Sequence, residues 1–416
     1  MQNSVVSQQT EGAVRVTSEA RRLYYLDWLR VLATLGVFLF HASNVFNGTN
    51  FEVRNAESSD VILIFDTFFY PWGMPLFFLL AGAGSWFALR RRSAGQFTRE
   101  RTLRLVVPFF AGALVLGSLQ IYLSWSHRTQ TGMFDGSLLE FATVRLSYPF
   151  PKIIGGVGYH LWFLGFLFLY SLLALPLFIW LKGEAGRRFV SRLAGLCEHR
   201  GALLFFILPL AAVRLGLQPF FPELQHWADF FYYGAFFVLG YLLFADERFT
   251  RAIRRDWPIL LGVGIAATLA GTAIGVSHSF DIEKAPDAFW EFLLWGLIVA
   301  CGWCWAGFFL SIGMRYLNSD SKALRYGQVT QLPFYVVHQP VILAIAYFVV
   351  RWEAIIPIKL LVVVLGALVA SIGLVELLIK RVGALRALCG MKGGQAVQVQ
   401  VVAAPHAIHA DSASAR

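Results

Sequence analysis

The chain enters its first apolar segment with Tyr25-Leu26-Asp27-Trp28-Leu29-Arg30, and His41 follows eleven residues after Arg30. A helix rises about 1.5 Å per residue, so Arg30 and His41 are separated by roughly 16 Å along the axis. Ionisable groups are costly inside a bilayer, and those that occur there usually serve a function. An ordinary alternative is that Asp27 and Arg30 pair with each other and snorkel to the interface, where a histidine is also common.

Composition places this segment in a membrane. Of the 416 residues, 57% are hydrophobic and only 14% are charged, and the mean hydropathy is +0.61. A soluble domain carries roughly a quarter charged residues, whereas a spanning helix needs about 20 mostly apolar residues. The sequence therefore predicts an all-α, polytopic membrane protein with about ten transmembrane helices. The ten apolar segments cover residues 24–46, 61–89, 105–125, 158–181, 202–217, 227–245, 258–276, 289–313, 332–350 and 355–379.

Lysine and arginine gather in alternate connections between these segments. The connection after the second segment alone carries Arg90, Arg91, Arg92, Arg99, Arg101 and Arg104. Positively charged loops stay in the cytoplasm, so both termini are expected to be cytoplasmic. The protein is expected to lie in the inner (plasma) membrane of a bacterium. The formal charge of +10 is then a topology signal, and it does not indicate a nucleic-acid partner.

The two ends of the chain differ in composition from the rest. Residues 1–20 and 391–416 are rich in Gln, Ser, Ala and Gly without helical periodicity, which predicts disordered cytoplasmic tails. The first apolar segment is long enough to remain as an anchor, so no cleaved signal peptide is expected. Residues 21–390 are predicted to form one membrane domain.

Two arginines of the basic connection have the spacing of a phosphate site. Arg101 and Arg104 lie one helical turn apart, and guanidinium groups bind phosphate through paired hydrogen bonds. Together with Arg30 they could hold a phosphorylated cofactor that enters from the cytoplasm. For any single arginine, a topogenic role alone is the simpler account.

The second and fourth segments carry further polar groups. The second contains Asp66 and is interrupted by Pro71-Trp72-Gly73-Met74-Pro75, which predicts a broken helix lining a cavity. The fourth begins near His160 and should run inward, which places His160 at about the same outer level as His41. We therefore expect two imidazoles to converge on the outer side.

The ninth segment places Tyr335, His338 and Gln339 just before Pro340. These side chains either line the inner cavity, or satisfy backbone groups that the proline frees. Both interpretations remain open on the sequence.

The cysteine pattern does not predict a metal site. Cys301-Gly302-Trp303-Cys304 has the spacing of a redox or zinc motif, but it lacks a second pair of ligands and lies in an apolar helix. Small residues that pack one helix against another are the simpler explanation.

These stretches together resemble one known family. The resemblance rests on five stretches: Asp27 to Arg30 with His41, Met74-Pro75-Leu76-Phe77-Phe78 with Gly82, the basic run to Arg104 and Pro108, His160-Leu161-Trp162-Phe163-Leu164, and Tyr335 to Pro340. Over roughly residues 20–385 they resemble the acyltransferase-3 integral membrane acyltransferases. The Asp27-Trp28-Leu29-Arg30-Val31 stretch is most similar to the branch that contains glucan biosynthesis protein C. Many members have Gly at the place of Val31, which leaves donor and acceptor open.

The resemblance implies transfer of an acyl group, acetyl or succinyl, from cytoplasmic acyl-coenzyme A to a hydroxyl of a glycan or other acceptor on the outer side. His41 is then expected to be the general base, with Asp66 or His160 orienting it. The donor is expected to be bound by Arg30, Arg101, Arg104, Tyr335 and His338. No metal is expected.

A transporter of an anionic metabolite or acyl donor is the rival class, because it would also use about ten spans and intramembrane arginines. Transporters often show paired helix breaks in two repeated halves, whereas only the second segment carries a marked Pro/Gly interruption. A noncatalytic membrane partner in an envelope assembly would leave His41 and the arginines unexplained.

Overall fold

A computed structural model describes residues 23–277 and 288–391. The expected disordered tails, residues 1–20 and 391–416, lie outside these ranges except for residue 391. The structure is 81% helix, and the described residues contain no strand, so the predicted all-α class is confirmed. The helices are α1 (Tyr24–Ser43), α2 (Asp60–Arg91), α3 (Ala94–Arg101), α4 (Val107–Gly112), α5 (Ser118–Gln130), α6 (Leu138–Leu146), α7 (Ile153–Gly158), α8 (Trp162–Leu173), α9 (Leu175–Lys182), α10 (Glu184–Leu196), α11 (Ile207–Leu217), α12 (Trp227–Leu243), α13 (Glu247–Arg255), α14 (Trp257–Ser277), α15 (Ala288–Tyr316), α16 (Lys322–Val349), α17 (Ile356–Leu374) and α18 (Gly383–Leu388).

Within the described residues, eight helical stretches are long and apolar enough to cross a membrane. They are Tyr24–Ser43, Asp60–Arg91, Ala94–Gln130, Ile153–Leu173, Trp257–Gly275, Phe289–Tyr316, Lys322–Val349 and Ile356–Ile379. Two further expected spans correspond to weaker candidates. Ala202–Leu217 is a shorter apolar helix, and α12 forms a pair with α13 that is bent by 105°. The chain is thus multi-pass, while the count of ten stays a prediction.

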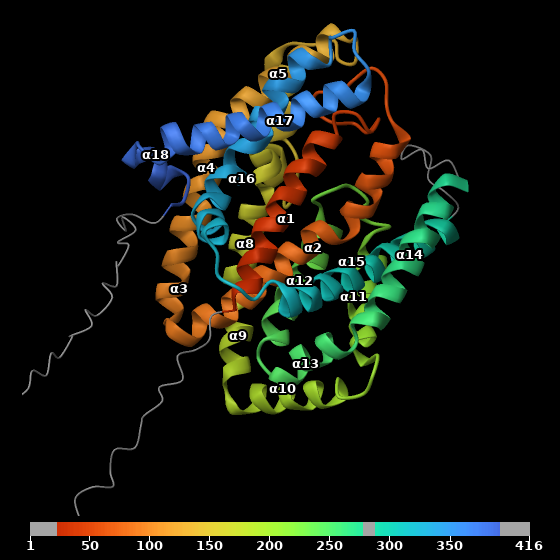
Figure 1. The fold of residues 1–416 in the computed structure, drawn as a ribbon, viewed down its shortest axis with the longest axis vertical. Coiled ribbons are helices and arrows are strands. Elements are labelled where there is room, and N and C mark those ends of the chain that lie inside the picture. Colours follow the sequence, from red (N-terminus) through yellow and green to blue (C-terminus); the bar gives the residue numbers. More distant parts are fainter. Residues whose placement is uncertain (1–22, 278–287, 392–416) are drawn as a thin grey trace, which may run out of the picture.

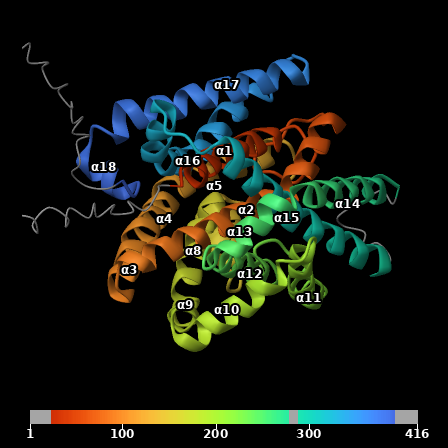
Figure 2. The ribbon, with the colours of Figure 1, turned by 60° about the horizontal axis from the view of Figure 1, so that its bottom comes forward.

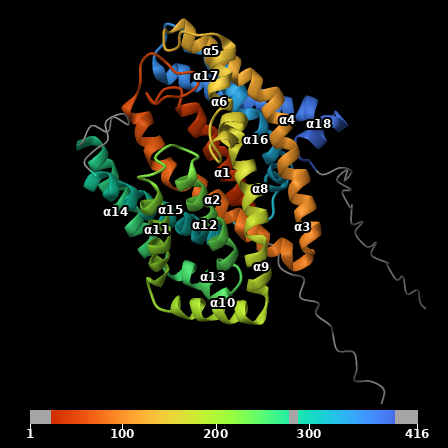
Figure 3. The same ribbon diagram turned by 180° about the vertical axis from the view of Figure 1, so that it is seen from behind.

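The helices form an elongated bundle with two distinct ends. Figure 1 shows α3, α10 and α13 at one end, which we call the α3 face. Figure 3 shows α5 and α6 gathered at the other end, which we call the α6 face. Helices α1, α2, α8, α12 and α16 run through the middle, and Figure 2 shows α17 on the side of the bundle opposite α10. Side chains of the central helices therefore lie between the two faces.

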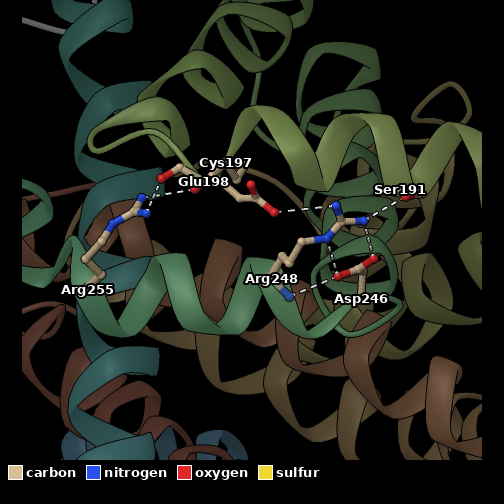
Figure 4. Close-up of polar contacts among 6 residues, drawn as sticks. All are labelled: Ser191, Cys197, Glu198, Asp246, Arg248 and Arg255. Atoms are coloured by element: carbon tan, nitrogen blue, oxygen red, sulfur yellow. Dashed lines mark hydrogen bonds and ion pairs between the residues drawn. The ribbon is translucent and has the colours of Figure 1, made fainter.

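At the α3 face, two amphipathic helices, α10 and α13, are joined by hydrogen bonds (Figure 4). The last carbonyls of a helix have no partner within it, and the Arg255 guanidinium donates to those of Cys197, at 3.0 Å, and Glu198, at 2.5 Å. Arg248 donates to Ser191 Oγ at 2.7 Å and to Asp246 Oδ2 at 2.8 Å. These bonds tie the α10 terminus to α13 across the surface.

The predicted break in the second span is wrong, because α2 is one helix that continues through Pro71 and Pro75. A proline inside a helix leaves a carbonyl of the preceding turn without its N–H partner, and packing against neighbouring helices can stabilise such a segment. Here Gly302 of α15 lies so close that a Cβ on it would be 2.8 Å from the Pro71 carbonyl oxygen. The absence of a side chain at Gly302 therefore lets α15 approach α2 at this carbonyl.

Candidate active site

A cavity of about 300 Å³ opens beside α3 and extends toward the middle of the bundle. Arg30, Arg101 and Arg104 lie on its walls, and Tyr335 also lines it. Apolar side chains form much of the remainder: Val37, Met74, Phe77, Ala81, Ala88, Phe97, Leu105, Phe163, Leu164, Leu167 and Leu332. The cavity therefore combines a cationic region with an apolar one.

Arg30 is held in place from three helices. Its Nη1 donates to Asp27 Oδ1 at 3.0 Å, and its Nη2 donates to the Leu80 carbonyl at 3.0 Å. Gln328 of α16 in turn donates to Asp27 Oδ2 at 2.9 Å. A Cβ on Gly84 would lie 2.9 Å from Arg30 Nη2, so the absence of a side chain there makes room for the guanidinium. Arg30, paired with Asp27, thus lines the cavity and does not simply snorkel.

Arg101 and Arg104, which lie one helical turn apart, both line the cavity. A π-helical turn covers Thr102–Val106, and such turns, which are frequent at functional sites, alter which residues share a face. Arg101 Nη2 donates to Ser85 Oγ of α2 at 3.0 Å, and Arg104 lies 3.8 Å from Glu100. Within the described residues, neither arginine has an ion pair shorter than 3.8 Å.

Three imidazoles, those of His41, His160 and His338, lie together next to Tyr335. The rings of His41 and His338 are stacked with centroids 5.2 Å apart, and His160 lies edge-on to both, at 6.4 Å from His41 and 5.2 Å from His338. The Tyr335 hydroxyl donates to the His160 carbonyl. Residues from α1, α16 and the turn before α8 therefore meet at one point next to the cavity.

The hydrogen bonds of this cluster assign the protonation of its ring nitrogens. His338 Nδ1 lies 2.7 Å from the Tyr335 carbonyl oxygen, which only accepts, so Nδ1 carries the proton. In a neutral ring His338 Nε2 is then an acceptor, and it lies 3.2 Å from His41 Nδ1, which must donate. His41 Nε2 is thereby left with a free lone pair. Among the described residues, no hydrogen bond uses this nitrogen, and the His41 side chain is half-buried.

His160 is fixed in a different manner. Its Nε2 lies 3.1 Å from the carbonyl oxygens of both Tyr335 and Val336, so this nitrogen donates. Its Nδ1 is buried and has no hydrogen-bond partner in the described residues. The bonds connect His160 to the backbone of α16 and leave its own Nδ1 unused.

Asp66 serves the loop that follows α1. It accepts from Ser43 Oγ and, at 2.6 Å, from Asn47 Nδ2, and its side chain is buried. The sequence predicts that Asp66 could orient His41. Among the described residues Asp66 instead bonds Ser43 and Asn47, and the partner of His41 is His338. Asp66 thus ties α2 to the last residue of α1 and to Asn47.

Apart from Asp66, the predicted site residues fall into two groups. Arg30, Arg101, Arg104 and Tyr335 line the cavity. The histidines, His41, His160 and His338, form the cluster beside it. Residues 23–277 and 288–391 contain no group of three His, Cys, Asp or Glu placed to hold a metal ion.

Sequence reasoning missed Thr34 and Gln331, which also line the cavity. Thr34 could have been found, because positions 30, 34, 37 and 41 lie on one face of a helix. Gln331 offered no comparable signal, since its contact with the cavity depends on how α16 packs.

The family model described as the acyltransferase domain of acyltransferase-3 proteins matches residues 23–378. The chain belongs to the acyltransferase-3 family. It is similar to the proteins named "Glucans biosynthesis protein C" of Salmonella paratyphi A (strain ATCC 9150 / SARB42), Salmonella agona (strain SL483) and Salmonella enteritidis PT4 (strain P125109). Each is 24% identical over 339 residues, which is 78% of this chain and 83% of the relative. No solved structure matches the chain.

Membership of the acyltransferase-3 family, together with the apolar helices, makes this protein an integral, multi-pass membrane acyltransferase. Such an enzyme has an acyl donor and a hydroxyl acceptor as its substrates. The predicted resemblance is thereby confirmed at the level of the family.

Proposed function

We propose that this acyltransferase-3 protein moves an acetyl or succinyl group from acyl-coenzyme A, bound in the cavity beside α3, to a glycan hydroxyl that approaches His41 from the α6 face. The observation that carries the proposal is the continuity of the site: arginines line the cavity, and Tyr335 joins its wall to the three histidines. The relatives' name supports a glucan as the acceptor.

The donor fits the cavity by charge and by length. Arg30, Arg101 and Arg104 would bind the phosphates of coenzyme A, and the apolar wall with Phe77 and Leu164 would accept the uncharged pantetheine arm. The roughly 16 Å between Arg30 and His41 suits an extended arm that ends in a thioester. Residues 90–104 are rich in arginine, which supports a cytoplasmic α3 face, with both termini on that side of the inner membrane.

In the proposed reaction, His41 Nε2 takes the proton of the acceptor hydroxyl as its oxygen attacks the thioester carbonyl carbon. The carbon–sulfur bond then breaks, the ester remains on the glycan, and the proton passes from His41 to the departing coenzyme A sulfur. His338 holds His41 in the tautomer that leaves Nε2 free, and the Tyr335 carbonyl holds His338. The arrangement parallels the way a third group orients the base in hydrolase triads.

Binding of the donor provides the first test. Coenzyme A and its acetyl and succinyl esters should raise the Tm of the detergent-purified wild type in a saturable way. Arg30→Ala should weaken this binding by roughly 10- to 100-fold, because it removes charge-assisted hydrogen bonds to phosphate. Arg99, which is exposed on α3 and does not line the cavity, provides the matched control, and Arg99→Ala should bind as the wild type does.

Failure of every ester to stabilise folded wild-type protein would contradict the proposal. Uptake of an acyl ester into vesicles without release of free thiol, in the presence of acceptor, would instead indicate the transporter class.

The role assigned to His338 gives a second prediction. His338→Gln keeps an amide oxygen that can accept from His41 Nδ1, so it should retain more activity than His338→Ala, which removes the acceptor. Both variants should lose kcat while coenzyme A still raises their Tm, because His338 does not line the cavity. Equal kcat values for the two variants would show that the bond to His41 does not matter.

A further inference from the structure

A second cavity, of about 440 Å³, lies on the α6 face, away from the donor cavity. One wall comes from the segment before α7 and the other from the loop between α11 and α12. Its lining residues are Tyr148, Pro149, Lys152, Phe220, Phe221, Pro222, Glu223 and His226. Neither the predicted site nor the reaction proposed above uses any of them.

The loop that forms one wall is fixed from below by a buried ion pair. Arg214 of α11 and Asp229 of α12 are each 3% exposed and are bonded to each other. Asp229 Oδ2 also accepts from the Gln225 backbone N–H at 2.6 Å. Gln225 has a positive φ of 61°. Residues other than glycine rarely adopt this backbone conformation, and it persists only where the surrounding structure imposes it. The wall is therefore held in one shape.

The two walls are joined across the cavity by an ion pair. Lys152 Nζ lies 2.5 Å from Glu223 Oε2, and 56% of the Glu223 side chain is exposed. Lys152 also lies 4.3 Å from the centre of the Tyr148 ring. The pair presents both hydrogen-bond donors and acceptors without net charge, which matches a neutral polyhydroxyl compound better than an anion.

The remaining lining is aromatic. Phe221 and His226 are stacked with centroids 4.8 Å apart, and Phe220 is 75% exposed. The faces of aromatic rings carry partial negative charge, so they attract the C–H groups on the face of a sugar ring. Aromatic anchors of a membrane interface would instead point outward to the lipid, whereas these rings line a cavity.

A line of contacts leads from this cavity to the histidines. Tyr148 and the Arg145 carbonyl both pack against Gly156, where a Cβ would touch them. The Arg145 guanidinium lies 4.2 Å from the centre of the Tyr159 ring, and Tyr159 precedes His160. The Tyr159 side chain is 4% exposed and its hydroxyl is buried without a hydrogen-bond partner in the described residues.

Glu52 and Phe51 complete this connection. Both oxygens of Glu52 accept from Arg145 Nη2 at 2.7 Å. Burial lowers the pKa of Arg145, but Glu52 and the neighbouring tyrosines outweigh that effect, so the overall shift is upward. The Phe51 ring lies 6.4 Å from that of His41. Polar and aromatic groups therefore extend from the cavity to the reacting imidazole.

We propose that the cavity between Tyr148 and Phe221 is a subsite for the acceptor, which binds a neutral glucose unit of a glucan while another unit of the same chain reaches His41. This inference rests on the proposed function. A subsite removed from the point of transfer gives an oligosaccharide more contact than a single sugar, so the enzyme prefers long acceptors.

The test measures glucan binding and transfer separately. Isothermal titration calorimetry would compare maltohexaose, laminarihexaose, glucose and an acidic hexamer of galacturonic acid on the detergent-purified full chain. At least one neutral hexamer should bind more tightly than glucose. Phe221→Ala should weaken that binding and raise the acceptor KM by roughly tenfold, through loss of the aromatic face, with kcat at saturating acceptor unchanged. Phe221→Trp should restore both values.

The matched control is Phe205→Ala, because Phe205 is 70% exposed and lies outside both cavities; it should bind the hexamers as the wild type does. Tighter binding of the galacturonic acid hexamer, or an unchanged KM in Phe221→Ala, would overturn the subsite. If the wild type itself showed neither coenzyme A binding nor thiol release, the proposed function would fail, whereas a working wild type with unaffected pocket variants would refute the subsite alone.

Discussion

Replacing His41 with alanine should lower the rate of acyl transfer by about 100- to 10,000-fold, the range that a positioned general base contributes. His41 Nε2 has a free lone pair because His338 accepts the proton of Nδ1 and the Tyr335 carbonyl accepts that of His338. The variant keeps the arginines and the apolar wall of the donor cavity. We therefore expect coenzyme A to raise its Tm as it does for the wild type, while kcat falls.

The measurement is release of free coenzyme A thiol at saturating acceptor. His199 is exposed and follows the end of α10, and His199→Ala provides the matched control, with transfer at the wild-type rate expected. His160→Ala tests whether His160 could be the base in place of His41, because His160 Nδ1 is also unpaired within the described residues. Full transfer by His41→Ala, together with a loss in His160→Ala, would move the base to His160.

Helical periodicity made one part of this site predictable. Arg30 and His41 stand on the same face of α1, so their side chains could be placed along one line at a known rise per residue. The all-α class could be predicted from the lengths of the apolar segments, because a helix is one of the few structures that satisfy all backbone hydrogen bonds inside a bilayer.

Contacts between distant segments were not predictable from one sequence. His41 and His338 are 297 residues apart, and Asp66 bonds Ser43 and Asn47 where an imidazole was expected. The break predicted at Pro71-Trp72-Gly73-Met74-Pro75 is absent, and the close approach of Gly302 of α15 to the Pro71 carbonyl is not evident from the local sequence of α2. The π-helical turn at Thr102–Val106 has no single residue as its signal.

The contact between α2 and α12 is a very close helix approach that bears on the donor cavity. A Cβ on Gly240 of α12 would lie 2.0 Å from the Leu79 carbonyl oxygen, and one on Gly82 of α2 would lie 2.0 Å from that of Phe237. Small residues allow such close packing in membranes, where it is a main source of association between helices. Leu80, whose carbonyl accepts from Arg30, and Ser85, which accepts from Arg101, lie on this part of α2.

Gly240→Ala should therefore destabilise the fold by about 2 kcal/mol or more, because the added methyl forces two backbones apart. In a helix without such a contact the same change is favourable by about 1 kcal/mol. A Cβ on Gly262 of α14 would meet no atom within 4 Å, so Gly262→Ala is the control and should keep or raise the Tm.

Separation of α2 from α12 would also displace the acceptors of Arg30 and Arg101, so Gly240→Ala should bind coenzyme A more weakly even where it remains folded. Thermal unfolding with and without coenzyme A measures both effects, and a wild-type Tm for Gly240→Ala would show that α2 and α12 do not approach this closely.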